Sequence, residues 1–302
     1  MLYKTMKTEN VGIVVVTYNR LKLLKEVINS LRDQDYQSRD IIIVNNGSTD
    51  NTSERLGEQN DLIVINQGNC GGAGGFHTGM KYVAEHDYDY CWIMDDDVIC
   101  ENTALSELLL GIKAKENIGF VCSKVLGLDN YAMNTPVVDN RPGDNGYSDY
   151  TDLIDNQMIK VKEATFVSVL FSVKTICEFG LPYKEYFIWG DDTEYTMRIS
   201  KHYDCYMVCK SIVTHCRTIQ TNLSFETERD QRRLKNYYYM FRNQAYNNMK
   251  YNSGKRLRQC MGLLKRATLY CLHAEFYKAK ILTKAAIDIL GFNPVLDYPG
   301  KL

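Results

Sequence analysis

The chain has 302 residues and a mass of 34.8 kDa, and its 45% hydrophobic and 24% charged residues exclude a disordered chain, a fibre and a small disulfide scaffold. The net charge of −1 conceals an asymmetry, because residues 1–230 carry 22 Lys and Arg against 34 Asp and Glu, whereas residues 231–284 carry 13 against Glu275 alone. The acidic body does not attract nucleic acid through its overall field, and the basic tail suits a phosphate, an anionic membrane surface or an acidic partner.

The sequence also indicates the cellular compartment of the protein. No stretch approaches about 18 consecutive apolar residues, and residues 1–10 lack the apolar core of a signal peptide. The ten cysteines are scattered without C-x-x-C spacing, which indicates reduced and mostly buried thiols. We therefore expect a cytoplasmic protein that does not span a membrane.

The first part of the chain alternates strands with helices. Apolar β-branched runs predict the strands, and apolar residues at helical spacing predict the helices. In chain order the expected elements are a strand at 11–16, a helix at 21–31, a strand at 41–44, a short helix, a strand at 62–65, a glycine-rich loop, a helix from about Phe76, and a strand at 90–94. Such alternation predicts an α/β fold with a mostly parallel, doubly wound sheet.

The middle of the chain is less regular. Residues 128–155 are polar with little periodicity, which indicates a long functional loop. Around it we expect a helix near 103–113 and strands at 119–122, 164–173 and 206–209, with a helix, the loop 186–190 and a helix from 192 to about 201 between the last two. From about Glu226 the chain reads as helical with a break at 252–254, which predicts two helices or a helical hairpin. We therefore divide the chain into an α/β domain, 1–230, and a basic, tyrosine-rich helical region, 231–302.

Polar residues follow the predicted parallel strands, where ligands of open α/β sheets bind. Three consecutive acids, Asp95, Asp96 and Asp97, follow the strand at 90–94 and would repel one another without a cation. Asp95 and Asp97 point the same way in an extended chain and suit Mg²⁺ or Mn²⁺. The alternative is a solvated acidic turn that caps the next helix.

The glycine-rich stretch 68–75 offers backbone N–H groups and close approach to a ligand, although such a turn is as often structural. It is not a G-x-x-x-x-G-K-[ST] motif, and it does not follow the first strand as a G-x-G-x-x-G motif would. These departures argue against P-loop NTPases and, more weakly, against dinucleotide oxidoreductases.

A second acidic cluster lies at 189–195. Asp191 and Asp192 follow Trp189 and Gly190, and a carboxylate beside an aromatic side chain suits a general base for a sugar hydroxyl. The competing interpretation is a helix cap with Glu194 three residues after Asp191. His215 follows an expected strand and is either a structural histidine or a further metal ligand that favours Mn²⁺.

Together, these clusters resemble the family 2 inverting glycosyltransferases of GT-A fold, from about Val11 to Tyr246. The resemblance rests on the segments 14–20, 44–50, 69–76, 95–97 and 189–195 and on His215. The segments 69–76 and 189–195, together with His215, resemble the galactofuranosyltransferase and rhamnosyltransferase subgroup more than chitin or cellulose synthases. The Q-x-x-R-W motif of processive members is absent, so transfer of one or a few sugars is expected.

The resemblance implies a role for each matching residue. Asp95, Asp97 and His215 would bind the metal, Asp192 would be the catalytic base, and Asp191 its neighbour on the acceptor side. The nucleotide-sugar site would comprise Thr17, Asn19, Arg20, Asn45, Asn46, Asn69, Gly71, Gly72 and Asp96, and the acceptor site Trp189, Gly190, Asp191 and Glu194. Relatives mostly carry an acid where this chain has Asn45 and Asn46, so the base that is read stays open.

The resemblance implies transfer of galactofuranose from UDP-galactofuranose to a glycan or polyprenyl-linked glycan acceptor in surface polysaccharide synthesis. The same-class alternative is a dTDP-rhamnose-dependent rhamnosyltransferase. A nucleotidyltransferase would favour a basic loop near the first strand, where only Arg20 lies. The intact acids and His215 argue against a non-catalytic sugar-nucleotide-binding assembly subunit.

The basic tail contributes two expectations. Arg232, Arg233 and Arg242 are candidates to hold the donor diphosphate, and the alternative is a solvated helix with its aromatic residues in a core. Farther on, Lys and Arg alternate with Leu and Met at 255–269, a pattern typical of a helix on an anionic bilayer. A peripheral contact with the inner face of the cell membrane would suit a lipid-linked acceptor, and a partner subunit or a homo-oligomer is the alternative.

Overall fold

Strand β1 (Val11–Thr17) lies in the parallel half of a twisted ten-stranded sheet. The computed structural model describes residues 8–217, 224–252 and 254–300. Neighbouring strands follow the order β3-β2-β1-β4-β9-β6-β10-β8-β7, and β5 pairs with β10. The other strands are β2 (Arg39–Asn45), β3 (Leu62–Asn66), β4 (Tyr90–Asp95), β5 (Val98–Cys100), β6 (Ile118–Leu126), β7 (Val137–Val138), β8 (Met158–Glu163), β9 (Val169–Ser172) and β10 (Asp204–His215).

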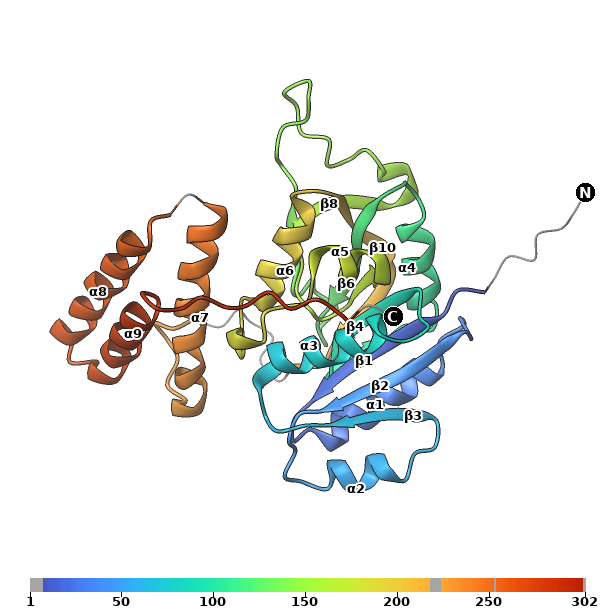
Figure 1. Ribbon diagram of the computed structural model, residues 1–302, viewed down its shortest axis with the longest axis horizontal. Helices are drawn as coiled ribbons and strands as arrows, with labels where there is room; N and C mark the ends of the chain where they lie inside the picture. The colour runs from blue at the N-terminus through green and yellow to red at the C-terminus, as the bar shows by residue number, and fades with distance from the viewer. Residues whose placement is uncertain (1–7, 218–223, 253, 301–302) are drawn as a thin grey trace, which may run out of the picture.

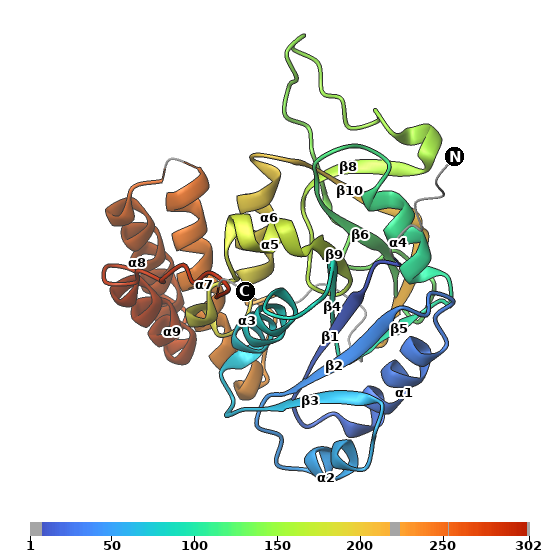
Figure 2. The same cartoon turned by 45° about the vertical axis from the view of Figure 1, so that its right-hand side comes forward.

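Helices cover both faces of this sheet (Figures 1 and 2). Successive residues of β1 supply the two cores, because Ile13 and Val15 pack with α1 (Leu21–Arg32) while Val14 and Val16 pack with α3 (Gly71–Ala84). The remaining helical segments of the sheet domain are α2 (Thr52–Gly57), α4 (Ala104–Ile112), α5 (Val173–Phe179), α6 (Asp191–Ser200) and the short 3₁₀ turns η1 (Ile154–Asn156) and η2 (Lys184–Tyr186).

The predicted α/β sheet is confirmed, but two expected elements differ from the structure. The predicted strand at 164–173 is too long, because β8 ends at Glu163 and β9 covers only Val169–Ser172. Strand β9 lies between β4 and β6 and runs antiparallel to both. It thereby joins the parallel pairs on its two sides, β1 with β4 and β6 with β10.

The glycine-rich stretch was expected to be a loop, yet α3 begins at Gly71 rather than near Phe76. Two of its glycines face the sheet, since a Cβ on Gly75 would lie 2.3 Å from Val16 and one on Gly79 would lie 2.2 Å from Val14. Glycine at these positions lets the helix axis approach β1 more closely than any larger residue would allow.

The C-terminal region forms three helices in the described chain, where two were expected: α7 (Gln231–Tyr251), α8 (Arg256–Leu272) and α9 (Phe276–Asp288). They pack around a core of their own at one side of the sheet domain (Figure 1). Residues 289–300 then return across α3 to the sheet domain, where the Leu181 N–H donates to the Asp297 carbonyl at 2.8 Å. All ten cysteines are free thiols.

Candidate active site

The three consecutive acids lie where β4 ends, beside the end of β1. Thr17 Oγ1 donates to Asp96 Oδ2 at 2.7 Å. Arg20, just before α1, donates from Nη1 to Asp97 Oδ2 at 2.7 Å and to Asp96 Oδ1 at 3.2 Å. Asp96 and Asp97 are almost completely buried, whereas Asp95 is partly exposed. The structure therefore brings these predicted donor-site and metal-site residues together.

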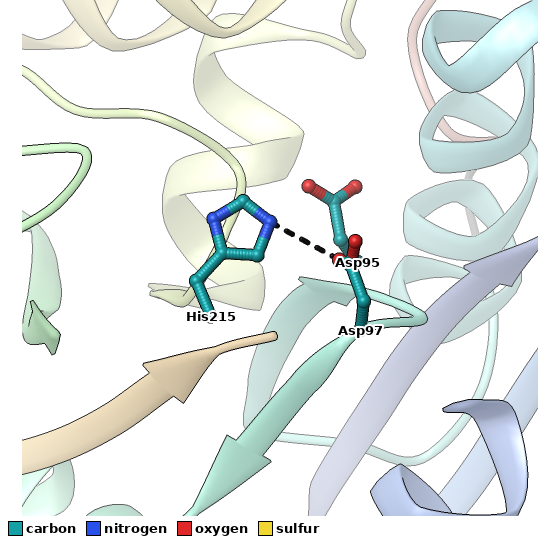
Figure 3. A group of neighbouring side chains, drawn as sticks. All are labelled: Asp95, Asp97 and His215. Atoms are coloured by element: carbon teal, nitrogen blue, oxygen red, sulfur yellow. Dashed lines mark ion pairs between the residues drawn. The ribbon is translucent and has the colours of Figure 1, made fainter. Parts of the chain in front are cut away.

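His215, the last residue of β10, reaches the same cluster. Its Nε2 lies 3.1 Å from Asp97 Oδ1, and its Nδ1 lies 2.8 Å from Asn134 Oδ1. The antiparallel pairing of β10 with β5 sets this position, because His215 is opposite Val98 in the register. Figure 3 shows His215 and the two aspartates pointing toward a common centre. Asn134 lies in the long polar loop, and no sequence motif marked it as a neighbour of His215.

This donor set fits a divalent metal ion. One ligand atom from each of Asp95, Asp97 and His215 lies within 4.8 Å of the others. Asp97 Oδ1 is buried, and the partner that the described residues show for it is His215 Nε2 at 3.1 Å. A buried oxygen of this kind is costly unless a cation satisfies it, and a set of two carboxylates and an imidazole suits Mn²⁺ or Mg²⁺.

The acids differ in protonation. Burial, followed by the charges of Asp97 and Asp96, raises the pKa of Asp95. Burial also raises the pKa of Asp96, to about 6, although Arg20 opposes this. Burial also acts to raise the pKa of Asp97. The hydrogen bond and charge of His215, together with Arg20, outweigh burial and lower this pKa. Asp97 is thus the acid most firmly held as a carboxylate.

Two further acids, Asp191 and Asp192, begin α6 after Gly190, which has a left-handed φ of 91°. Asp191 is buried, and its charge is among the neighbours that raise the pKa of Asp95. Burial and then the charge of Asp192 raise the pKa of Asp191 to about 8. Asp192 is partly exposed, and burial of its carboxyl raises its pKa as well. The second acidic cluster therefore acts on the first through the charge of Asp191.

Glu194, a predicted acceptor residue, has a different environment. It is fully buried and forms an ion pair with Arg198. Lys250 Nζ and Tyr251 Oη of α7 donate to Glu194 Oε1 at 2.7 and 2.6 Å. The contacts of its carboxylate lie within α6, to Arg198, and between α6 and α7, to Lys250 and Tyr251, and the acceptor role of Glu194 stays a prediction.

The predicted nucleotide-site asparagines hold the strand ends together. Asn19 Oδ1 accepts from the Thr49 N–H at 2.7 Å. Asn45 Nδ2 donates to Asn66 Oδ1 at 2.8 Å, and Asn46 Nδ2 donates to the Gly71 carbonyl at 2.8 Å. These bonds connect β1, β2 and β3 to the start of α3.

The start of α3 contacts the loop that precedes α6. Gly71 has a φ of 76°, and a Cβ there would lie 1.9 Å from the Phe187 carbonyl oxygen. The same oxygen accepts the Ala73 N–H at 3.1 Å. Asn69 Oδ1 accepts the Gly71 N–H at 2.9 Å, while a Cβ on Gly72 would meet no atom within 4 Å. Part of the predicted anion-binding helix end is thus bound by protein, and Gly72 faces open space.

The three arginines of α7 are not gathered at the acidic clusters. Arg232 is exposed, and Arg233 pairs with Glu228 at 2.7 Å. Arg242 is buried, donates to the Glu185 carbonyl at 2.7 Å, and lies 3.9 Å from the Phe292 ring centre. The Arg242 guanidinium donates to the Glu185 carbonyl and to Asn243 Oδ1, and its phosphate role stays a prediction.

Comparison with known proteins places the chain in a family. The family model for glycosyl transferase family 2 matches residues 12–166. Galactofuranosyltransferase GlfT1 of Mycolicibacterium smegmatis is 26% identical over 199 residues, covering 64% of this chain and 66% of the relative. The poly-β-1,6-N-acetyl-D-glucosamine synthase of Staphylococcus aureus is 29% identical over 117 residues, covering 37% of this chain and 28% of that one. The chain thus spans just under two thirds of the galactofuranosyltransferase and much less of the synthase.

Solved structures share the fold. S. aureus TarS (residues 1–349) in complex with UDP has a TM-score of 0.55 at 14% identity, covering 86% of this chain and 72% of that chain. GalNAc-T7 with UDP, GalNAc and Mn²⁺ has a TM-score of 0.56 at 13% identity, covering 80% and 52%. These likenesses confirm the GT-A fold predicted from the sequence.

Proposed function

The chain belongs to glycosyl transferase family 2, and we propose that it is a metal-dependent inverting enzyme that transfers galactofuranose from UDP-galactofuranose to a glycan or lipid-linked glycan acceptor in surface polysaccharide synthesis. The observation that carries this proposal is the cluster of Asp95, Asp97 and His215, whose ligand atoms lie within 4.8 Å of one another. The similarity to the galactofuranosyltransferase supports the choice of sugar. The UDP in the two solved neighbours supports the choice of nucleotide.

On this proposal, Asp95, Asp97 and His215 hold the divalent ion, which supplies positive charge to the leaving diphosphate. Arg20 and Thr17 orient the acids, since both donate hydrogen bonds to them. Asn19, Asn45 and Asn46 keep the strand ends and the start of α3 in place around the nucleoside. Asn69, Gly71, Gly72 and Asp96 complete the proposed donor side.

Asp192 is the proposed base. It is more exposed than Asp191, so its carboxylate is the one of the pair that an acceptor hydroxyl can reach. Asp191, with a pKa of about 8, holds a proton near neutral pH and suits the role of neighbour. Asp192 takes the hydroxyl proton as the acceptor oxygen attacks the anomeric carbon opposite the leaving diphosphate, which inverts the configuration in one step. Trp189 and Gly190 would line the acceptor side.

Calorimetric titration with UDP and with dTDP, each with and without Mn²⁺, tests the donor site without an acceptor. We expect UDP binding that requires Mn²⁺ and is lost in Asp97→Ala. Tighter binding of dTDP would favour the rhamnosyltransferase alternative. Failure to bind either nucleotide would overturn the donor-site proposal.

The outer face of α8 supports a peripheral membrane contact. Leu257, Met261 and Leu264 are 65%, 61% and 39% exposed, and Arg258 and Lys265 lie exposed beside them. Basic amphipathic helices of this kind lie on anionic bilayers. Among the described residues, no helix is both long and apolar enough to cross a membrane. We expect sedimentation with anionic but not with neutral vesicles, and weaker sedimentation in Leu257→Gln/Met261→Gln; protein that stays in the supernatant with both vesicles contradicts the contact.

A further inference from the structure

The loop that leads into α6 has an unusual backbone. Phe187 and Trp189 have φ values of 65° and 60°, in the left-handed region that residues with a Cβ seldom adopt, and Gly190 follows with 91°. Such a backbone is strained and persists only where its surroundings hold it in place. The contacts that hold this loop therefore decide where the side chains of Trp189 and Asp192 lie.

Those contacts come from α7, more than fifty residues later in the chain. Asn243 is fully buried, and its Nδ2 lies 3.0, 3.2 and 2.7 Å from the carbonyl oxygens of Tyr186, Ile188 and Trp189. Asn247 Nδ2 donates to the Gly190 carbonyl at 3.0 Å. Two side-chain amides thus donate to four carbonyl oxygens of one short loop.

The orientation of the Asn243 amide is set by its other end. Arg242 donates from Nε and Nη2 to Asn243 Oδ1 at 3.1 and 2.9 Å, and Nη2 also donates to the Glu185 carbonyl. Because the guanidinium occupies the amide oxygen, the NH₂ group must face the loop carbonyls. In the same way, Asn247 Oδ1 accepts the Tyr186 hydroxyl at 2.6 Å, which leaves its NH₂ group for Gly190.

Aromatic side chains of α7 hold the loop from the same side. The Tyr239 ring stacks on Phe187 with centroids 4.7 Å apart, and the Tyr237 ring meets Trp189 edge-on at 5.2 Å. From the opposite side, the Ala73 N–H of α3 binds the Phe187 carbonyl. The loop is therefore held between the donor-side helix α3 and the C-terminal helix α7.

We propose that Asn243 and Asn247 are positioning residues for the acceptor side of the transferase site, because they hold the strained loop that presents Trp189 and Asp192. This inference rests on the proposed function. The proposed metal ligands Asp95, Asp97 and His215 lie at the ends of β4 and β10. The hydrogen bonds of Asn243 and Asn247 described above reach neither strand. Loss of the amides therefore displaces the proposed base and leaves UDP binding intact.

Fluorescence tests the clamp without any enzymatic assay. The chain has two tryptophans. Trp92 is fully buried and Trp189 is partly exposed, so acrylamide quenching reports mainly on Trp189. We expect Asn243→Leu, which keeps the volume but loses the donors, and Asn247→Ala to increase quenching and shift the emission to longer wavelength. Asn248→Ala is the matched control, because Asn248 donates to Gln259 at 3.4 Å and is bonded to α8 rather than to the loop.

Kinetics then assign the role. The assay measures UDP release from UDP-galactofuranose with Mn²⁺ and with water as the acceptor. We expect kcat to fall about 10- to 100-fold in Asn243→Leu and Asn247→Ala, since small misplacement of a catalytic group has effects of this size. The KM for the donor should stay within twofold of the wild-type value. Unchanged Trp189 quenching in Asn247→Ala overturns the inference even if Asn243→Leu does not fold. An equal loss of UDP affinity also overturns it. A wild-type chain that releases no UDP contradicts the proposed donor, and the fluorescence comparison still decides whether the amides hold the loop.

Discussion

The Nε2 atom of His215 lies 3.1 Å from Oδ1 of Asp97, which joins the end of β10 to the turn after β4. These residues are more than a hundred positions apart in the chain, and strand pairing alone brings them together. If they share a metal ion, His215→Ala should weaken Mn²⁺ binding at least ~10-fold, because loss of a residue that only hydrogen-bonds to a metal ligand already has effects of this size. Calorimetric titration of Mn²⁺ into the UDP-saturated protein measures this.

His202→Ala is the control for this variant, because His202 is exposed and lies against the Phe179 ring. It should bind Mn²⁺ as the wild type does. An His215→Ala protein with unchanged Mn²⁺ affinity would remove His215 from the proposed ligand set and leave the two aspartates.

Asp191 and Asp192, the two acids at the start of α6, should have different roles in the reaction. Asp192→Asn should lower transfer by about 10²–10⁴-fold, the usual contribution of a general base, with UDP affinity unchanged. Burial raises the Asp192 pKa, so the wild-type rate should rise with pH through a value above the ordinary Asp pKa of 3.8. The measurement is kcat against pH for the wild type, with single-pH kcat and UDP titration for the variant.

Asp191→Asn supplies the comparison. If Asp191 is only a neighbour, its variant keeps more activity than Asp192→Asn. The reverse order would transfer the role of base to Asp191, and loss of UDP binding in Asp192→Asn would reassign that residue to the donor side.

The buried Glu194 should make stability depend on pH. Burial alone would raise the Glu194 pKa, but the charge of Arg198 and then that of Lys250 lower it below the ordinary 4.5. A lowered folded-state pKa means that the stabilisation is complete above about pH 4.5 and is lost as pH falls through the folded value. Glu194→Gln should therefore be less stable than the wild type by about 3–5 kcal/mol at pH 7, as expected for breaking a buried ion pair.

Urea unfolding at pH 7 and at pH 3 checks this. The difference between Glu194→Gln and the wild type should shrink at the lower pH, since the wild-type carboxylate is then protonated in part. Glu54→Gln, on the exposed surface of α2, is the control and should match the wild type at both pH values. A difference that does not change with pH would mean that packing, rather than charge, explains the loss.

The acid clusters were predictable because parallel strands end at one edge of a sheet. Asp95 and Asp97 follow a strand whose apolar run is evident in the sequence, and His215 ends another. The asparagine clamp was not predictable in this way. Asn243 and Asn247 lie four residues apart in a helix rich in polar residues, and only the packing of α7 on the loop distinguishes them from Asn236 or Asn248.

Predictions from local sequence preference also fail where packing overrides that preference. The glycines at 71–75 predict a turn by their backbone freedom, yet they form the first turns of α3. The predicted strand at 164–173 is an apolar run, but Ala164 and Phe166 pack into the core outside any strand. Burial explains the apolar character of both stretches, and composition alone does not reveal which backbone conformation buries them.

Gly79 offers a direct test of that packing. In an open helix position, alanine is more favourable than glycine by about 1 kcal/mol. At Gly79 the new Cβ would lie 2.2 Å from Val14 Cγ1 and 3.1 Å from Val44 Cγ2, so α3 would have to move away from β1 and β2. Since overpacking costs about 1–3 kcal/mol, Gly79→Ala should lower the free energy of unfolding. Gly262→Ala in α8, where a Cβ meets no atom within 4 Å, should raise it. Urea unfolding of both variants measures the two changes, and a Gly79→Ala protein as stable as Gly262→Ala would show that α3 tolerates a wider spacing from the sheet.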